Sequence, residues 1–222
     1  MAFLTKKEAT ATTPQIVTLV VDDSGSMQGQ KAKDATTSMQ DLAMSIQSGN
    51  LGTHGFRFLL NILKFGDNAV DLYVAAHPDK ADLNNIIFRG DSGGTNMPGA
   101  LHRSAQVTIE ALNACRRIEY IKEQDSPPPV CIFFSDGENM VGSLADVESA
   151  AAELKSIAHK GGSIDVVAVG IGMKPEHFPV MQKIASRPEL AVNIDPLKLA
   201  EFIAKAGQTI FENGTADQIA RP

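Results

Sequence analysis

The sequence predicts an α/β protein with a doubly wound, mostly parallel sheet of six strands, helices on both faces and one antiparallel edge strand. Short apolar runs rich in β-branched residues alternate along the chain with segments that have apolar side chains at three- and four-residue spacing, as strands and helices do when they alternate. Polar residues follow two of the runs abruptly, at Asp22 and at Ser135. Buried strands of a parallel sheet end in this way at an edge where ligands bind.

Six strands are predicted from the apolar runs. They cover residues 16–21, 56–65, 70–76, 130–134, 164–169 and 190–194. The turn at residues 66–68 is too short for a helical crossover, so the third strand should pair antiparallel to the second and form an edge. The run at 130–134 is apolar throughout and is expected at the centre. Right-handed crossovers between the other strands then give a Rossmann-like sheet.

Helices are predicted between these strands. They cover residues 30–47, 79–88, 98–122, 144–159, 176–185 and 197–211. In the first helix, apolar residues from Ala32 to Ile46 form one face, and Gly49 and Gly52 are expected to end it. Residues 15–212 are therefore predicted to form one domain. We expect residues 1–14 to be a flexible arm and residues 213–222 to be a flexible tail.

The chain has 222 residues and a formal net charge of −6. This length suffices for one large domain, and the negative charge argues against a nucleic-acid partner, which usually requires a basic face. No stretch approaches the roughly 20 apolar residues of a membrane span, and the N-terminus lacks the apolar segment of a signal peptide. Cys115 and Cys131 lie in a helical and a strand pattern, so we expect both to be buried and reduced, which fits a cytoplasmic protein.

The most informative stretch is the end of the first strand, Asp22-Asp23-Ser24-Gly25-Ser26. Gly25 lets the chain curl there, so that alternate side chains can converge on one point. The converging groups are the carboxylate of Asp22 and the hydroxyls of Ser24 and Ser26. Hard oxygen ligands on a tight loop suit a small hard cation such as Mg²⁺.

An Asp-x-Ser-x-Ser sequence after a first apolar strand resembles the metal-ion-dependent adhesion site of the von Willebrand factor type A domain. The family pattern also needs a distant Thr and a distant Asp, which this chain has at Thr95 and Asp136. The resemblance therefore implies that Asp22, Ser24, Ser26, Thr95 and Asp136 hold Mg²⁺, with Mn²⁺ or Ca²⁺ as alternatives. It also implies that an Asp or Glu of a partner protein completes the metal shell.

The resemblance covers roughly residues 15–211. The short, unadorned chain is similar to bacterial stand-alone A domains of the tellurite-resistance type, a likeness that implies kinase or phosphatase partners; other members of the family work beside AAA+ ATPases. On this analogy the chain is expected to be a metal-dependent protein interaction module in a bacterial stress-response or signalling system, without catalytic activity.

Two other interpretations of the motif stay open. Ser and Asp at the start of a helix often bind free backbone amides, so the three motif side chains could form a helix cap. The same rim could also serve a metal-dependent phosphatase. Asp23, Asn96 and Glu138 lie next to the predicted ligands, where they either hydrogen-bond to them or are solvated.

Several enzyme classes are disfavoured. Gly90-Asp91-Ser92-Gly93-Gly94 and Ala75-Ala76-His77 look like serine-protease segments, but only fifteen positions separate His77 from Ser92, and a triad is recognised by geometry. A phosphatase of the haloacid dehalogenase type needs an Asp where this chain has Ser24. The sequence has no Gly-x-x-x-x-Gly-Lys-Ser/Thr loop, and its five histidines have no zinc-ligand spacing.

Overall fold

The computed structural model describes residues 7–51, 56–75 and 81–221, and its six strands form one sheet in the order β3-β2-β1-β4-β5-β6. The strands are β1 Gln15–Asp22, β2 Phe58–Phe65, β3 Ala69–Val74, β4 Val130–Ser135, β5 Asp165–Ile171 and β6 Ala191–Ile194. All neighbouring pairs are parallel except β2 and β3, which are antiparallel. The predicted fold class is confirmed, including its antiparallel edge strand.

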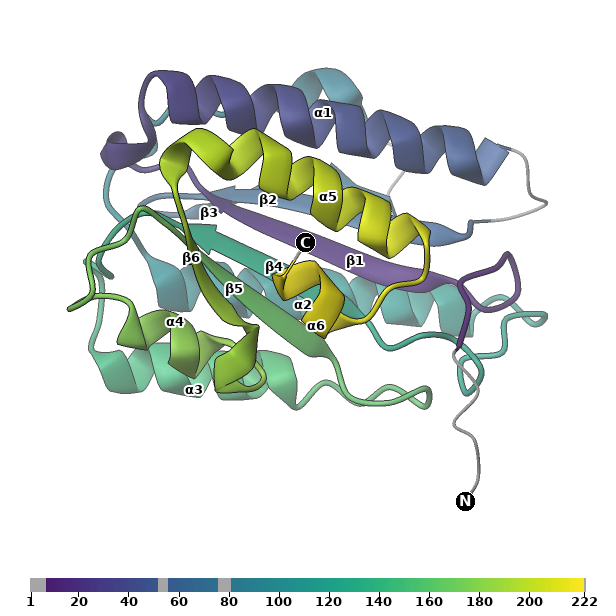
Figure 1. The fold of residues 1–222 in the computed structure, drawn as a ribbon. Coiled ribbons are helices and arrows are strands. Elements are labelled where there is room, and N and C mark those ends of the chain that lie inside the picture. The colour runs from purple at the N-terminus through teal and green to yellow at the C-terminus, as the bar shows by residue number, and fades with distance from the viewer. Residues whose placement is uncertain (1–6, 52–55, 76–80, 222) are drawn as a thin grey trace.

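Helices cover both faces of this sheet (Figure 1). They are α1 Gln30–Leu51, α2 Met97–Arg116, α3 Leu144–Lys155, α4 Pro179–Ile184, α5 Leu199–Phe211 and α6 Ala216–Ala220. Helix α1 packs beside α5 on one face, whereas α2 packs beside α3 on the other. The arrangement is the doubly wound one, in which each amphipathic helix buries its apolar side against the sheet.

Aromatic side chains pack on both faces of the centre of the sheet. All eight residues of β1 are buried. On β4, Phe133 and Phe134 point to opposite faces, as successive strand residues do. Phe133 packs against Phe65 of β2 with ring centroids 5.0 Å apart, and Phe134 packs edge-on against Phe202 of α5 at 6.1 Å. Because Val21 is paired with Phe134, β1 and β4 reach the same edge of the sheet together.

Some helix boundaries differ from the predicted ones. Helix α2 ends at Arg116 rather than at residue 122, because the Arg116 guanidinium donates two hydrogen bonds of 2.8 and 2.9 Å to the Glu123 carboxylate, and the chain has to turn back for it. Helix α1 continues through Gly49 to Leu51, and Gly52 lies outside the described residues. The helix predicted at 79–88 also lies partly outside them; its described part contains a single 3-10 turn at Leu83–Asn85.

The described parts of the predicted arm and tail, residues 7–14 and 213–221, make contacts with the domain. Within the tail, α6 begins with a capping box between Thr215 and Gln218 and buries Ile219. Within the arm, Ala9 is buried, and its N–H donates to the side chain of Asn213 at 2.8 Å. A five-residue helix is too short to show a periodicity, so the sequence pattern could not reveal it.

Cys115 on α2 and Cys131 on β4 are buried free thiols, and their predicted burial is confirmed. Burial disfavours the thiolate and raises the pKa of Cys115 to about 11 and that of Cys131 to about 12. Both thiols therefore belong to the core.

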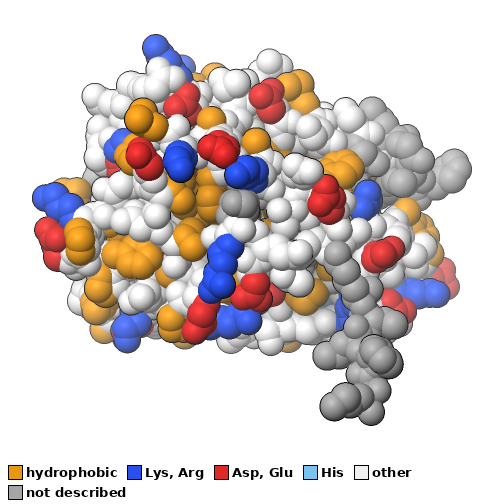
Figure 2. Space-filling model, viewed as in Figure 1, with side chains coloured by type: hydrophobic (Ala, Val, Ile, Leu, Met, Phe, Trp, Pro, Cys, Tyr) orange, Lys and Arg blue, Asp and Glu red, His pale blue; other side chains and the backbone are white. Residues whose placement is uncertain are grey.

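The surface that carries α1 and α5 has basic and acidic side chains interspersed, with hydrophobic side chains exposed between them (Figure 2). Among the helices of the described residues, none has both the length and the apolar character that crossing a membrane requires.

Candidate metal centre

The candidate site begins where β1 ends. Asp22 is the last residue of β1 and is fully buried, and the chain then enters a short 3-10 helix, η1, at Gly25–Met27. The side chain of Met27 is fully buried and anchors this turn in the core. The backbone N–H of Gly25 donates to the carbonyl of Gly93 at 3.3 Å, which links the turn to the Gly-rich loop at residues 89–96, before α2.

The hydroxyl of Ser24 is not a helix cap. Ser24 stands at the N-terminal cap position of η1, yet its side chain makes no capping hydrogen bond. Its Oγ instead lies 3.2 Å from the Oγ of Ser26, and the Ser26 hydroxyl donates to Oδ1 of Asp136 at 2.6 Å. The two motif hydroxyls therefore face the strand end that carries Asp136, as predicted for a shared site.

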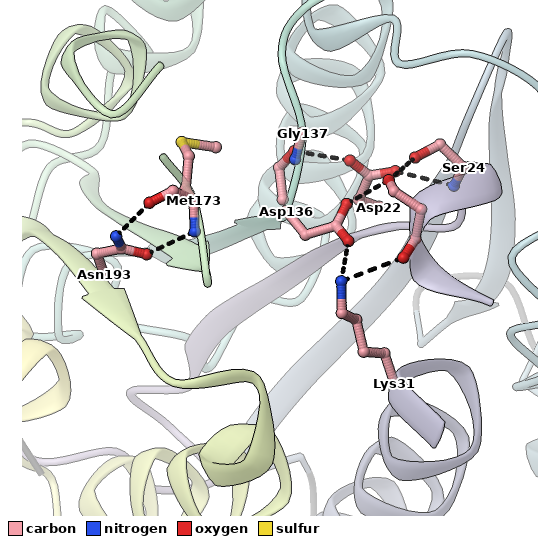
Figure 3. A network of polar contacts seen from close by, with 9 residues as sticks. Asp22, Ser24, Lys31, Asp136, Gly137, Met173 and Asn193 are labelled. Atoms are coloured by element: carbon pink, nitrogen blue, oxygen red, sulfur yellow. Dashed lines mark hydrogen bonds and ion pairs between the residues drawn. The ribbon is translucent and has the colours of Figure 1, made fainter. Parts of the chain in front are cut away.

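The carboxylate of Asp22 joins the ends of β1 and β4 (Figure 3). Its Oδ1 accepts the backbone N–H of Ser24 at 2.9 Å, and its Oδ2 accepts the hydroxyl of Ser135 at 2.6 Å. Oγ of Ser135 in turn accepts the N–H of Gly137 at 3.3 Å. These bonds fix the Asp22 side chain beside the loop that carries Asp136.

Thr95 reaches the same place from the loop before α2. It is buried, and its carbonyl accepts the N–H of Met140 at 2.8 Å. A Cβ atom added at Gly137 would lie 3.5 Å from Oγ1 of Thr95 and 3.7 Å from Oγ of Ser26, so these two hydroxyls face one spot over the Gly137 backbone. The structure thus brings all five sequence-predicted side chains to one rim of the sheet.

The electrostatics of Asp22 are those of a buried carboxylate that lacks a counter-charge. Burial raises its pKa, which hydrogen bonds from Ser135 and Ser24 only partly oppose, and the nearby Asp136 raises it further. Among the described residues, no Lys, Arg or His forms an ion pair with Asp22. A cation at this rim would supply the missing positive charge.

Asp136 has a cationic partner that the sequence did not predict. Nζ of Lys31, from the first turn of α1, forms an ion pair with Oδ2 of Asp136 and donates to the carbonyl of Ser26 at 3.1 Å (Figure 3). Lys31 follows the motif by five residues and belongs to no pattern that predicts a contact with Asp136. Its proximity in sequence to Ser26 was the only available signal.

Asp23 was predicted to support the ligands or face solvent, but it is fully buried in a network of its own. Its Oδ2 accepts Nζ of Lys64 and the hydroxyl of Ser92, both at 2.7 Å, and its Oδ1 accepts the N–H groups of Arg89 at 2.7 Å and Gly90 at 2.6 Å. Burial alone would raise its pKa, but Lys64 and the loop donors lower it overall. Asp23 thereby holds the Gly-rich loop that leads to Thr95.

The other two neighbours have separate environments. Asn96 caps α2, since its side chain accepts the N–H of Gly99 at 3.0 Å and donates to the carbonyl of Asp67 at 3.0 Å. Glu138 is largely exposed and lies 3.7 Å from the ring of His177. The serine-protease resemblance has no support either, because the Ser92 hydroxyl donates to Asp23, while His77 lies outside the described residues.

The donor set is two carboxylates and three hydroxyls. Within the described ranges, no group of three or more His, Cys, Asp or Glu side chains is arranged to hold a metal, so a transition-metal site built from nitrogen or sulfur ligands has no support there. Oxygen donors alone match the ligand preference of Mg²⁺, Mn²⁺ and Ca²⁺. These residues fit a hard divalent cation.

Solved structures share this fold at low sequence identity. Proximal thread matrix protein 1 from the mussel byssus, in a structure with a zinc-occupied MIDAS motif, matches with a TM-score of 0.61 and 16% identity over 90% of this chain and 48% of that one. The pilus adhesin SpaC from Lactobacillus rhamnosus GG matches with a TM-score of 0.66 and 18% identity over 94% of this chain and 31% of that one. A von Willebrand factor type A protein from Catenulispora acidiphila matches with a TM-score of 0.59 and 18% identity, over 92% and 43%.

This chain therefore spans less than half the length of these three proteins. A comparison with curated proteins finds no match. The model of the von Willebrand factor type A domain matches residues 17–204, which include the strand-end turn, the Thr95 loop and the Asp136 loop. On that match and on the sheet order described above, the chain belongs to the von Willebrand factor type A domain family.

Proposed function

We propose that the chain is a divalent-metal-dependent protein interaction module. The residues that would hold the metal are Asp22, Ser24, Ser26, Thr95 and Asp136. The observation that carries this proposal is the fully buried carboxylate of Asp22, which has hydrogen-bond donors but no ion-pair partner among the described residues. Burying such a charge without a counter-ion is costly, so its retention at a rim with four more oxygen donors favours a cation ligand.

The proposed metal is Mg²⁺, with Mn²⁺ and Ca²⁺ as chemically similar alternatives. A bound divalent ion would supply a concentrated positive charge that attracts an anionic group. Five side chains, three of them neutral, leave a hard cation short of its usual six oxygens. We therefore propose that an Asp or Glu of a partner protein fills the remaining position. A structurally similar mussel protein has zinc at its MIDAS motif, which supports metal binding at this rim.

Exposed hydrophobic side chains beside the rim favour a protein as the partner. Met140 is 73% exposed, although its N–H is bonded to Thr95, and Leu144, at the start of α3, is 53% exposed. Val141 between them is exposed as well. Large apolar side chains around a charged centre suit a protein interface, where they are buried at its core.

The wider role is proposed from family analogy alone. We propose a kinase, a phosphatase or an AAA+ ATPase as the partner, and a regulatory or scaffolding role in a bacterial stress-response or signalling system of the tellurite-resistance type. The proposed compartment is the cytoplasm, and the chain is proposed not to be an enzyme.

Calorimetric titration with Mg²⁺ tests the ligand set. The parent protein should bind one ion, whereas Thr95→Ala should bind it more weakly and lose about 1 kcal/mol of stability in EDTA, since one hydroxyl and one buried methyl group are removed. Asp125→Ala, which removes an exposed carboxylate from the segment that leads into β4, is the control and should bind as the parent does. Equal affinity of Thr95→Ala and parent would rule out Thr95 as a ligand.

Two further measurements separate a binding module from an enzyme. A protein partner should be retained by the parent with Mg²⁺, and lost in EDTA or with Asp22→Ala. Hydrolysis of p-nitrophenyl phosphate with Mg²⁺ or Mn²⁺, abolished by Asp22→Ala, would favour the metal-dependent phosphatase instead. Retention of the partner in EDTA would mean that another face of the domain binds it.

A further inference from the structure

Two lysine–carboxylate pairs lie at the same edge of the sheet, and they differ in the number of hydrogen-bond donors that each carboxylate has. The Asp23 carboxylate accepts from Lys64 and from three further donors of the Gly-rich loop. The Asp136 carboxylate has the Lys31 ammonium at Oδ2 and the Ser26 hydroxyl at Oδ1. The Asp23 pair is thus part of a closed network, whereas the Asp136 pair rests on one ammonium group and one hydroxyl.

Lys31 and Asp136 also differ in exposure. The side chain of Asp136 is 1% exposed and that of Lys31 is 27% exposed. A carboxylate that is almost completely buried needs a nearby positive charge, and Lys31 provides it from the first turn of α1. An ammonium group is a compact charge on a flexible four-carbon stem, and this one has a path to solvent, so it can leave Asp136 without moving the helix.

We infer that Lys31 is an internal competitor for the divalent ion, which neutralises Asp136 in the metal-free protein and thereby weakens the metal affinity of the site. The inference rests on the proposed function, since it concerns the same site. An ion bound to Asp136 displaces the ammonium group from that carboxylate or is repelled by it, because two cations a few ångströms apart interact unfavourably even at an effective dielectric constant of about 20. Lys31 therefore sets the metal concentration at which the site fills.

The test is the Mg²⁺ dissociation constant of Lys31→Met, measured by calorimetry beside that of the parent. Removal of the competing charge should tighten binding by about tenfold or more. Lys31→Arg keeps the charge and should bind within about threefold of the parent. Lys33→Met, which removes an exposed charge from the same turn of α1, is the matched control and should change the affinity less than about twofold.

Thermal unfolding gives a second readout that does not depend on metal titration. In EDTA, Lys31→Met should melt below the parent because Asp136 stays buried without its counter-ion. In saturating Mg²⁺ the difference should disappear or reverse, because the ion replaces the ammonium group. Lys31→Gln should behave in the same way, and both substitutions keep good helix formers in α1.

The outcomes separate this inference from the proposed function. A parent that binds Mg²⁺, with Lys31→Met and Lys31→Gln binding equally or more weakly, would overturn the inference and leave the proposed function standing. In that case Lys31 would orient Asp136 rather than compete for it. A folded parent that binds no Mg²⁺, Mn²⁺ or Ca²⁺ would overturn both.

Discussion

Asp22 and Asp23 are adjacent, both are fully buried, and their carboxylates have opposite electrostatic surroundings. Lys64 and the loop donors lower the pKa of Asp23 despite its burial, whereas burial keeps the pKa of Asp22 raised. Successive residues at a strand end point to opposite sides, so one chain segment serves two environments. The charged Asp23 carboxylate stabilises the fold. The Asp22 side chain does so only when a cation balances its charge or when the charge is removed.

The substitution Asp22→Asn tests this difference. Because the pKa of Asp22 is raised in the folded protein, its charged form destabilises the metal-free fold at neutral pH, and the penalty fades as the pH falls and the carboxyl is protonated. An amide can still accept the Ser24 N–H and can donate to the Ser135 oxygen. We expect Asp22→Asn in EDTA at pH 7 to have a higher unfolding free energy than the parent, because the amide carries no charge that burial penalises, while it loses Mg²⁺ binding.

Urea unfolding of parent and variant in EDTA at pH 7 and pH 4.5 measures this gain. The difference between the two proteins should be larger at pH 7. Asp125→Asn controls for the loss of one surface charge and should be neutral at both values. A variant less stable than the parent at pH 7 would mean that the Asp22 charge is already balanced without a metal.

At the scale of elements, strands were predicted better than helix ends, and the reason lies in the contacts that fix each. The run at 130–134 is apolar because both faces of β4 are covered, so the burial of this strand can be inferred from the sequence. The observed strand is Val130–Ser135. The end of α2, in contrast, depends on the pair between Arg116 and Glu123. A helical periodicity does not predict that contact.

The site residues likewise differ in whether the local sequence or a distant contact determines their position. The five rim residues could be predicted because they form a motif at strand ends, although their role as metal ligands stays a prediction. Lys31 and the network of Asp23 could not be predicted, because their partners come from segments 41 to 105 residues away. Such contacts exist only after the sheet has brought β1, β2 and β4 together.

Substitution of Glu123 tests the anchor that ends α2. Glu123 is buried, accepts two hydrogen bonds from Arg116 and one from the N–H of Lys160 at 3.1 Å, and Arg116 lowers its pKa from 4.5 to about 2. A lowered pKa means that the stabilisation is present above pH 4.5 and is lost as the pH falls toward 2. Glu123→Gln should therefore cost roughly 2 kcal/mol at pH 7, and less at pH 3.5.

Chemical denaturation at these two pH values measures the cost. Glu119→Gln is the control, because Glu119 is exposed in the turn that follows α2, and it should change stability by less than about 0.5 kcal/mol at both values. A cost that is the same at pH 7 and at pH 3.5 would show that packing rather than charge holds Glu123.

At the scale of the whole molecule, the rim joins three segments that are far apart in the chain. Hydrogen bonds between Ser26 and Asp136 and between Ser135 and Asp22 join the turn at Asp22–Ser26 to the Asp136 loop. The N–H of Gly25, which donates to Gly93, and the N–H of Met140, which donates to Thr95, join both to the Thr95 loop. The turn follows β1 and the Asp136 loop follows β4, whereas the Thr95 loop precedes α2. An ion bound by all three would link them in the folded state only.

Mg²⁺ should therefore stabilise the fold against heat. A metal at ten times its dissociation constant adds about 1.4 kcal/mol by mass action if it binds only the folded state, which corresponds to roughly 3–6 °C of melting temperature for a domain of this size. Melts in EDTA and in Mg²⁺ measure the shift, with NaCl at matched ionic strength as the control for screening of the net charge of −6. Asp22→Ala should show no shift, because it lacks the buried carboxylate that the ion neutralises. Identical melting curves for the parent in EDTA and in Mg²⁺, together with no metal by elemental analysis, would contradict a metal-linked fold.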